Sequence, residues 1–159
     1  MANVYFANQS AHTPSTNHNW VLDAGTTITS NYGRILEVSW GGELTTTQQM
    51  RTRWLRPNTS ATTTFQQIGT SVYQSGNPQA GQSNMRFGTF TTVPTIPTAP
   101  MALYATSWNA HGGIGRWLAS PGEEWTIIAG TTTGKNQVVC VNDVGLTPTS
   151  MSCGVAWEE

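Results

Sequence analysis

The sequence predicts an all-β protein: an antiparallel β-sandwich of jelly-roll type with an extended N-terminal arm and a long loop excursion. Threonine, whose branched Cβ suits a pleated strand, is the commonest residue. Short runs of alternating apolar and polar residues recur, with Gly, Pro and Asn between them. These turn formers and β-branched residues interrupt every window with helical spacing.

The strands expected in the body of the domain follow from this alternation. In 34–40, Leu36, Val38 and Trp40 share one face, and in 48–55 Met50 shares its face with Trp54. Turns are expected at 109–113 and at 120–123, where Pro and Gly occupy favoured turn positions. About eight body strands with short turns favour a jelly roll; they are 20–29, 34–40, 48–55, 101–108, 114–119, 124–129, 137–142 and 151–157.

Two regions do not fit this pattern. Residues 1–20 read as an N-terminal arm, because only 4–6 resemble a strand and a polar stretch follows. Residues 57–100 read as an excursion from the sandwich domain 21–159, with short strands near 65–68 and 86–91. Pro94, Pro97 and Pro100 exclude a central strand there, so we expect this region to lie over a neighbouring subunit.

The composition excludes several classes of function. Charged residues make up 9% of the chain, against about 25% in typical soluble domains. The net charge of −1 argues against nucleic-acid binding, which requires a basic surface. No stretch approaches the ~20 apolar residues of a membrane helix, and the first residues do not resemble a secretory signal. We therefore expect a protein that is made in the cytoplasm, stays there or leaves it inside an assembly, and binds neither nucleic acid nor membrane.

The sequence shows no enzyme signature. The carboxylates lie mostly in expected turns or at the C-terminus, where solvent exposure is the ordinary explanation. His12, His18 and His111 match no metal-binding spacing, and there is no phosphate-binding glycine loop. We predict no catalytic residue, no metal and no cofactor.

Cys140 and Cys153 are expected on adjacent strands, where a cross-strand disulfide is geometrically possible. Two buried free thiols are the favoured interpretation for a protein that stays in the cytoplasm.

Contacts to a partner are expected from arginine and tryptophan side chains. Arginine pairs bidentately and stacks, so it is favoured at interfaces over lysine, and six of the seven basic residues here are arginine. Trp108 and Trp117 flank a glycine turn, where core, subunit interface and sugar-binding surface all remain open interpretations. The predicted interface residues are Arg51, Arg53, Arg56, Arg86, Trp108 and Trp117.

Residues 30–159 resemble a family of small tailed-bacteriophage virion proteins that includes capsid cement, or decoration, proteins. The resemblance rests on motifs at 34–43, 50–56, 120–123 and 154–159 and on the Pro/Gly/Thr-rich excursion. The polar residues before position 20 have no counterpart in it.

The resemblance implies a mechanical function. Cement proteins sit on the outside of the capsid, often as trimers, and bridge neighbouring subunits of the major capsid protein. We therefore expect a virion structural protein whose partners are the major capsid protein and its own copies in a homotrimer. The alternative is a trimeric receptor-binding module of a tail fibre or spike that recognises host surface glycan.

Overall fold

The computed structural model describes residues 4–12, 18–24, 32–43, 47, 49–58, 66–67, 73–74, 77–80, 85–89, 102–130, 136–144 and 150–159. The regular elements of this part of the chain are all strands. In chain order they are β1 (Val4–His12), β2 (His18–Asp23), β3 (Tyr32–Glu43), β4 (Gln49–Leu55), β5 (Gln66–Gln67), β6 (Tyr73–Gln74), β7 (Asn77–Ala80), β8 (Arg86–Thr89), β9 (Ala102–Asn109), β10 (His111–Leu118), β11 (Trp125–Ile128), β12 (Gln137–Val144) and β13 (Met151–Glu158).

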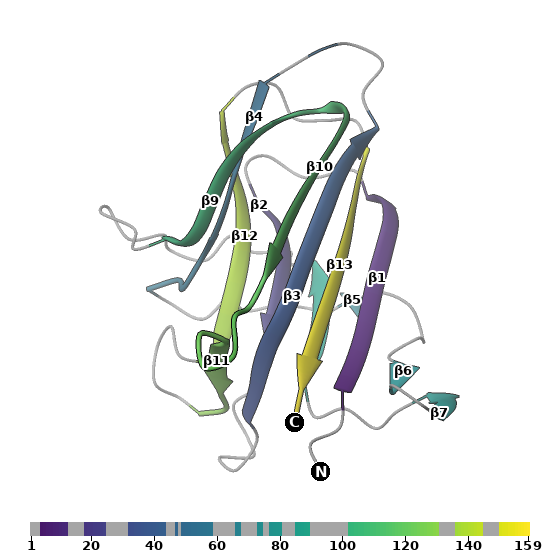
Figure 1. The fold of residues 1–159 in the computed structure, drawn as a ribbon, viewed down its shortest axis with the longest axis vertical. Coiled ribbons are helices and arrows are strands. Elements are labelled where there is room, and N and C mark those ends of the chain that lie inside the picture. The colour runs from purple at the N-terminus through teal and green to yellow at the C-terminus, as the bar shows by residue number, and fades with distance from the viewer. Residues whose placement is uncertain are drawn as a thin grey trace.

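These strands form two sheets that face each other (Figure 1). The seven-stranded sheet has the order β10-β3-β13-β1-β6-β7, with β11 also paired to β3. The six-stranded sheet has the order β5-β8-β2-β12-β4-β9. The pairings within both sheets are antiparallel. The predicted antiparallel β-sandwich is therefore confirmed.

The pairing of the long strands is nested along the chain. The first strand, β1, pairs with the last, β13, and β2 pairs with β12. Inside these pairs, β3 pairs with β10 and β4 pairs with β9. The chain thus runs out and back as a double ribbon, and successive ribbon strands alternate between the two sheets.

The core between the sheets is rich in tryptophan. Along β4, Met50, Thr52 and Trp54 point inward and are buried, as the alternation predicted. The Trp54 ring lies 6.3 Å from the rings of both Trp40 and Trp125, measured between centroids. Burying an aromatic side chain contributes more than burying a smaller one, so this cluster dominates the packing.

In β3 the inward-facing residues differ from the prediction. Ala156 of β13 pairs with Glu37 and Trp157 pairs with Ile35, so Leu36 is an extra residue that forms a bulge. The bulge shifts the alternation by one position. Ile35 is consequently fully buried, whereas Leu36, predicted to point inward with Val38, is only half-buried.

The prediction of an N-terminal arm is wrong for β1, which lies between β13 and β6 within the seven-stranded sheet. Tyr5 and Ala7 are buried, and Tyr5 stacks on Trp157 with ring centroids 6.0 Å apart. Gln9 accepts a 2.9 Å hydrogen bond from the Trp20 indole N–H. The polar residues of β1 therefore belong to an ordered strand; residues 13–17 lie outside the described part.

The prediction of a detached excursion at 57–100 is wrong for its described C-terminal part. Short strands occur as expected at β5 and β8, but β8 pairs with β2 inside the six-stranded sheet. Met85 and Phe87 are buried in the core, so this segment completes the sandwich. The three prolines at 94–100 lie outside the described residues, and contact with a neighbouring subunit stays a prediction.

Candidate functional site

The outer face of the seven-stranded sheet carries exposed apolar side chains. Alternation along β13 points Cys153 and Val155 into the core and Gly154 outward, and the neighbouring strands follow the same pattern. The large apolar side chains that are exposed in the described part all belong to strands of this sheet. They are Phe6 (45% exposed), Tyr32 (52%), Ile114 (79%), Leu118 (60%) and Ile128 (47%).

A shallow trough crosses the middle of this face. It consists of two adjoining depressions of about 460 and 330 Å³ that share Asn8, Ser39 and Gly154. The trough is hollow because its central positions on β3 and β13 are small; a Cβ on Gly154 would lie 2.9 Å from the Ser39 hydroxyl oxygen. We call this region the outer trough, and its outward-facing residues are Phe6, Asn8, Glu37, Ser39, Gly41, Ile114, Ser152, Gly154 and Ala156.

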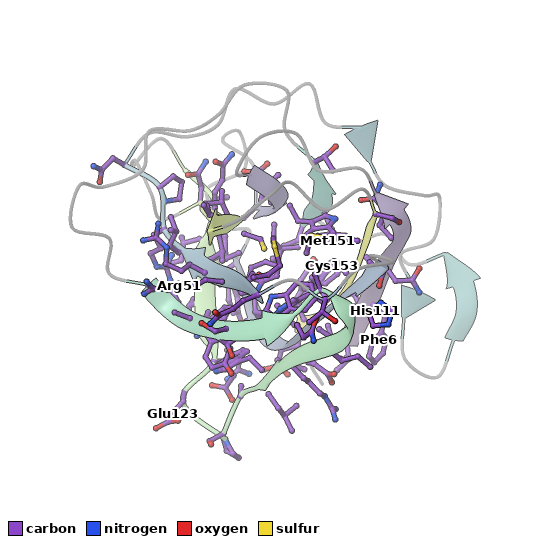
Figure 2. All side chains as sticks on the ribbon, turned by 90° about the horizontal axis from the view of Figure 1, so that it is seen from above. Phe6, Arg51, His111, Glu123, Met151 and Cys153 are labelled. Atoms are coloured by element: carbon purple, nitrogen blue, oxygen red, sulfur yellow. The ribbon has the colours of Figure 1, made fainter. Side chains whose placement is uncertain are left out.

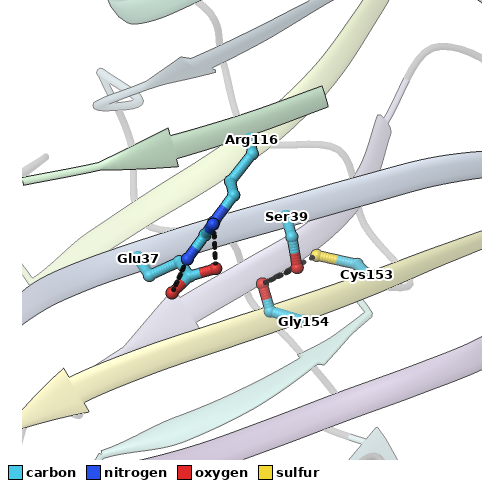
Figure 3. Close-up of polar contacts among 5 residues, drawn as sticks. All are labelled: Glu37, Ser39, Arg116, Cys153 and Gly154. Carbon is cyan, nitrogen blue, oxygen red and sulfur yellow. Dashed lines mark hydrogen bonds and ion pairs between the residues drawn. The ribbon is translucent and has the colours of Figure 1, made fainter. Parts of the chain in front are cut away.

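The charges beside the outer trough are paired. The Arg116 guanidinium donates to both carboxylate oxygens of Glu37, over 2.6 and 3.1 Å (Figure 3). These hydrogen bonds raise the pKa of Arg116. On the same face Arg34 forms an ion pair with Glu158. The face therefore presents apolar groups and small polar groups with almost no net charge.

The outer face of the six-stranded sheet is different. A second, smaller apolar cluster lies on it, formed by Val21, Leu55, Val139 and Val141, and each of these is at most 3% exposed. On this face Arg51 is exposed and Arg53 is half-buried. Arg51 and Phe6 lie on different sides of the molecule (Figure 2). An apolar surface available to a partner is thus found on the seven-stranded sheet.

The structure separates the six residues that were predicted to contact a partner. Arg51 and Arg53 share one outer face, as the alternation indicated, and remain candidates for contacts. The side chain of Arg86 lies outside the described part. Neither Arg51 nor Arg53 lines the outer trough.

For Arg56 and Trp108 the structure corrects the prediction. The Arg56 guanidinium donates a 2.5 Å hydrogen bond to the Thr126 carbonyl oxygen, which links the end of β4 to β11, and burial lowers its pKa. Trp108 is 8% exposed, and its indole N–H donates a 2.8 Å hydrogen bond to the Thr52 hydroxyl oxygen. Both side chains therefore hold the sandwich together.

Trp117 is intermediate between core and surface. Its ring stacks on Trp125, with centroids 3.8 Å apart and an interplanar angle of 18°. It is half-buried beside the core, so one face of the ring is already occupied by another side chain. One face of the Trp117 ring is therefore used inside the sandwich, and contact of its exposed part with a partner stays a prediction.

The residues that we predicted to contact a partner are all arginine or tryptophan. The outer trough consists mainly of small and aliphatic residues, so it was not predicted. The signal was present in 151–157, where small residues alternate with large apolar ones. It was also present at Ile114 and Leu118, which are four residues apart and therefore on one face of a strand. Both patterns identify an outward face, but neither says whether that face is covered.

The two cysteines lie on different sheets, so the expectation that their strands are adjacent is wrong. Cys140 is on β12 and Cys153 is on β13, and both carry a thiol that is buried in the core between the sheets. Burial, together with the nearby Cys140, raises the pKa of the Cys153 thiol well above its ordinary value. The thiol therefore stays protonated at neutral pH.

Metal-ligating side chains do not cluster in the part of the chain that the structure describes: no group of three or more His, Cys, Asp and Glu residues is placed to hold an ion. That part also lacks a helix long and apolar enough to cross a bilayer. No protein-family model matches the chain, and no curated protein matches it in sequence.

Proposed function

We propose that this chain is a structural virion protein, a homotrimer that binds the outside of a phage capsid and cements neighbouring major capsid protein subunits. One observation carries the proposal: the outer trough is an exposed, nearly neutral sheet face with apolar margins. The large apolar side chains that are exposed in the described part lie on this one sheet, and apolar groups gathered on one exposed face mark interaction sites on soluble proteins. The resemblance of residues 30–159 to cement proteins supplies the kind of partner.

We infer that the sandwich is of jelly-roll type. Support comes from the nested pairing of β1 with β13, β2 with β12, β3 with β10 and β4 with β9. A chain folded back on itself and wound into two sheets produces such an order.

The composition suits attachment to a repetitive surface. A face with paired charges attaches through shape and apolar burial, and the attachment depends little on salt. Each copy adds only a modest contact, but many copies on one shell act together, because binding at one point raises the effective concentration at the next. Low surface charge is tolerable when neighbours cover much of the surface.

Mass spectrometry of phage particles purified from cells that carry the gene tests the proposal. We expect the chain in the particle at a fixed ratio to the coat protein, and accessible to antibody from outside. Absence of the chain from intact particles would contradict the proposal.

Two matched variants test which face attaches. Phe6→Asp places a charge at the margin of the outer trough and is expected to abolish recovery of the chain with particles. Arg51→Ala changes the opposite outer face and is expected to leave recovery unchanged. The reverse result would move the attachment site to the six-stranded sheet.

A second candidate function is glycan recognition. A depression of about 250 Å³ near the turn between β9 and β10 is lined by Thr47, Gln49, Ser107, Trp108 and Asn109. Neutral hydrogen-bonding groups such as Thr47, Gln49 and Asn109 are the polar groups with which a site can orient an uncharged sugar. Glycan-array binding that is lost in Gln49→Ala would favour this function, and a blank array would count against it.

A further inference from the structure

The edges of the two sheets are protected to different degrees. Natural proteins shield edge strands with proline, charge or short length, because an open edge can pair with another chain. At one side of the sandwich the edge strands are the two-residue β5 and the four-residue β7, which contains Pro78. At the other side they are the eight-residue β9 and β10, which contain neither proline nor lysine, and the four-residue β11, which follows β10 along the same edge of β3.

Of these two long edges, β10 is the more open. Among the described residues β10 pairs only with β3, and its register is regular from Ile114 to Leu118. The two most exposed large apolar side chains of the described part lie on it: Ile114 at 79% and Leu118 at 60%. On β9, Trp108 is buried, and Leu103 and Tyr104 are packed against the core.

We propose that a second copy of this chain pairs with β10, antiparallel and about a two-fold axis, so that the two seven-stranded sheets become continuous. Edge-to-edge pairing adds backbone hydrogen bonds between the two strands. The two-fold axis passes through Arg116, midway between the two exposed apolar residues. It places Ile114 opposite Leu118 of the second copy and Leu118 opposite Ile114 of the second copy. Each apolar side chain then has an apolar neighbour across the new strand pair.

The charge at the centre of this contact is already compensated. The register brings Arg116 opposite Arg116 of the second copy, and two like charges in that position repel. Each guanidinium is held bidentately by its own Glu37, over 2.6 and 3.1 Å, so two neutralised pairs meet at the axis. The same four groups can also exchange partners across the axis, as an isologous contact allows.

The size of the contact sets its strength. One pair of eight-residue strands buries an area at the low end of the range for specific interfaces, roughly 1,200 Å² or less in total. The pairing is therefore weak in dilute solution and becomes populated where copies are concentrated. It does not depend on capsid attachment; on a shell it would join neighbouring trimers through two-fold contacts.

Sedimentation equilibrium of the purified full chain, from about 10 μM to about 1 mM, tests the pairing in the concentration range at which weak contacts form. We expect the wild-type mass to rise reversibly with concentration to at least twice that of the dilute species, because every copy in an oligomer carries its own β10 edge. The double variant Ile114→Lys, Leu118→Lys is expected to keep the dilute mass throughout. Both sites are exposed, so an unchanged circular dichroism spectrum and Tm are expected to confirm that the variant folds.

The matched control is Ala105→Lys, which changes an exposed residue of the other long edge strand, β9. We expect it to double in mass as the wild type does. Constant wild-type mass up to the highest concentration, or loss of doubling in Ala105→Lys but not in the β10 variant, overturns the proposal.

The axis position has its own test. In Arg116→Cys, the new thiol lies opposite the same thiol of the second copy. Mild oxidation of concentrated protein is therefore expected to give a disulfide-linked dimer. Ala105→Cys, on the other edge strand, is expected not to cross-link. Glu37→Gln removes the neutralising carboxylate and is expected to shift doubling to at least tenfold higher concentration. Equal cross-linking of the two cysteine variants would refute the two-fold axis at Arg116. Because neither measurement involves particles, failure here is separate from failure of the proposed capsid function.

Discussion

The two outer faces of this sandwich both carry apolar side chains but differ in exposure. On the six-stranded sheet, Val21, Leu55, Val139 and Val141 are buried. On the seven-stranded sheet, Phe6, Ile114 and Leu118 remain between 45% and 79% exposed around a trough of small residues. The comparison teaches that apolar content alone does not locate a binding surface; what matters is which apolar face stays open.

The largest expected effect comes from placing a carboxylate on each face. Val139→Asp buries a charge without a partner and is expected to reduce the free energy of unfolding by more than about 4 kcal/mol, or to prevent folding. Leu118→Asp, at 60% exposure, is expected to change it by less than about 1 kcal/mol. Urea denaturation measures both; similar costs at the two sites would mean that the faces are equally buried.

A smaller effect is expected from adding one methyl group on either side of the seven-stranded sheet. A Cβ on Gly115 would lie 2.1 Å from the Trp40 indole, so Gly115→Ala is expected to cost about 1–3 kcal/mol through overpacking. On the trough side, the nearest described atom to a Cβ on Gly41 would be the Ser152 hydroxyl oxygen, at 3.5 Å. Gly41→Ala is therefore expected to be nearly neutral, and thermal unfolding of both variants checks the contrast.

Arg56, which follows β4, and Arg51, within β4, are expected to differ in what their side chains contribute to stability. Arg56→Ala removes the hydrogen bond to the Thr126 carbonyl and the packing of a half-buried side chain, at an expected cost of about 1–2 kcal/mol. Arg51→Ala changes an exposed residue and is expected to stay within about 0.5 kcal/mol of the wild type. An Arg51 effect as large as that of Arg56 would show that Arg51 also has a structural role.

The smallest expected effect is a pH dependence from the core. The pKa of Cys153 is raised in the folded state, so the thiol's stabilising contribution is complete below the unfolded thiol's pKa of about 9. As the pH rises above that value, only the unfolded chain loses the proton. We expect the free energy of unfolding to fall by about 1 kcal/mol over the first pH unit above 9, and by less in Cys153→Ala.

Much of the fold could be predicted from alternation and turn residues. The body strands from β3 to β13 occur close to their expected positions, because Trp54, Val155 and similar residues recur with the period of two that a half-buried strand requires. The turn before Glu123 also forms, with the Glu123 amide donating to the Ser120 carbonyl over 2.9 Å.

The errors have a common physical cause, which is contact between distant parts of the chain. Leu36 was assigned to the core because a bulge opposite β13 cannot be seen in one strand's sequence. The strand β1 looked like an arm because its partner, β13, lies at the other end of the chain. Trp108 and Arg56 have the residue types of an interface but are used internally, and the outer trough consists of small residues that carry no chemical signature.

Electron cryo-microscopy of purified particles that contain the chain would show which face of the sandwich meets the capsid. We expect density for this sandwich on the outside of the shell, with the outer trough against the coat protein and the six-stranded sheet turned away from it. A map in which Phe6 and Gly154 face solvent while Arg51 and Arg53 contact the coat would contradict the account.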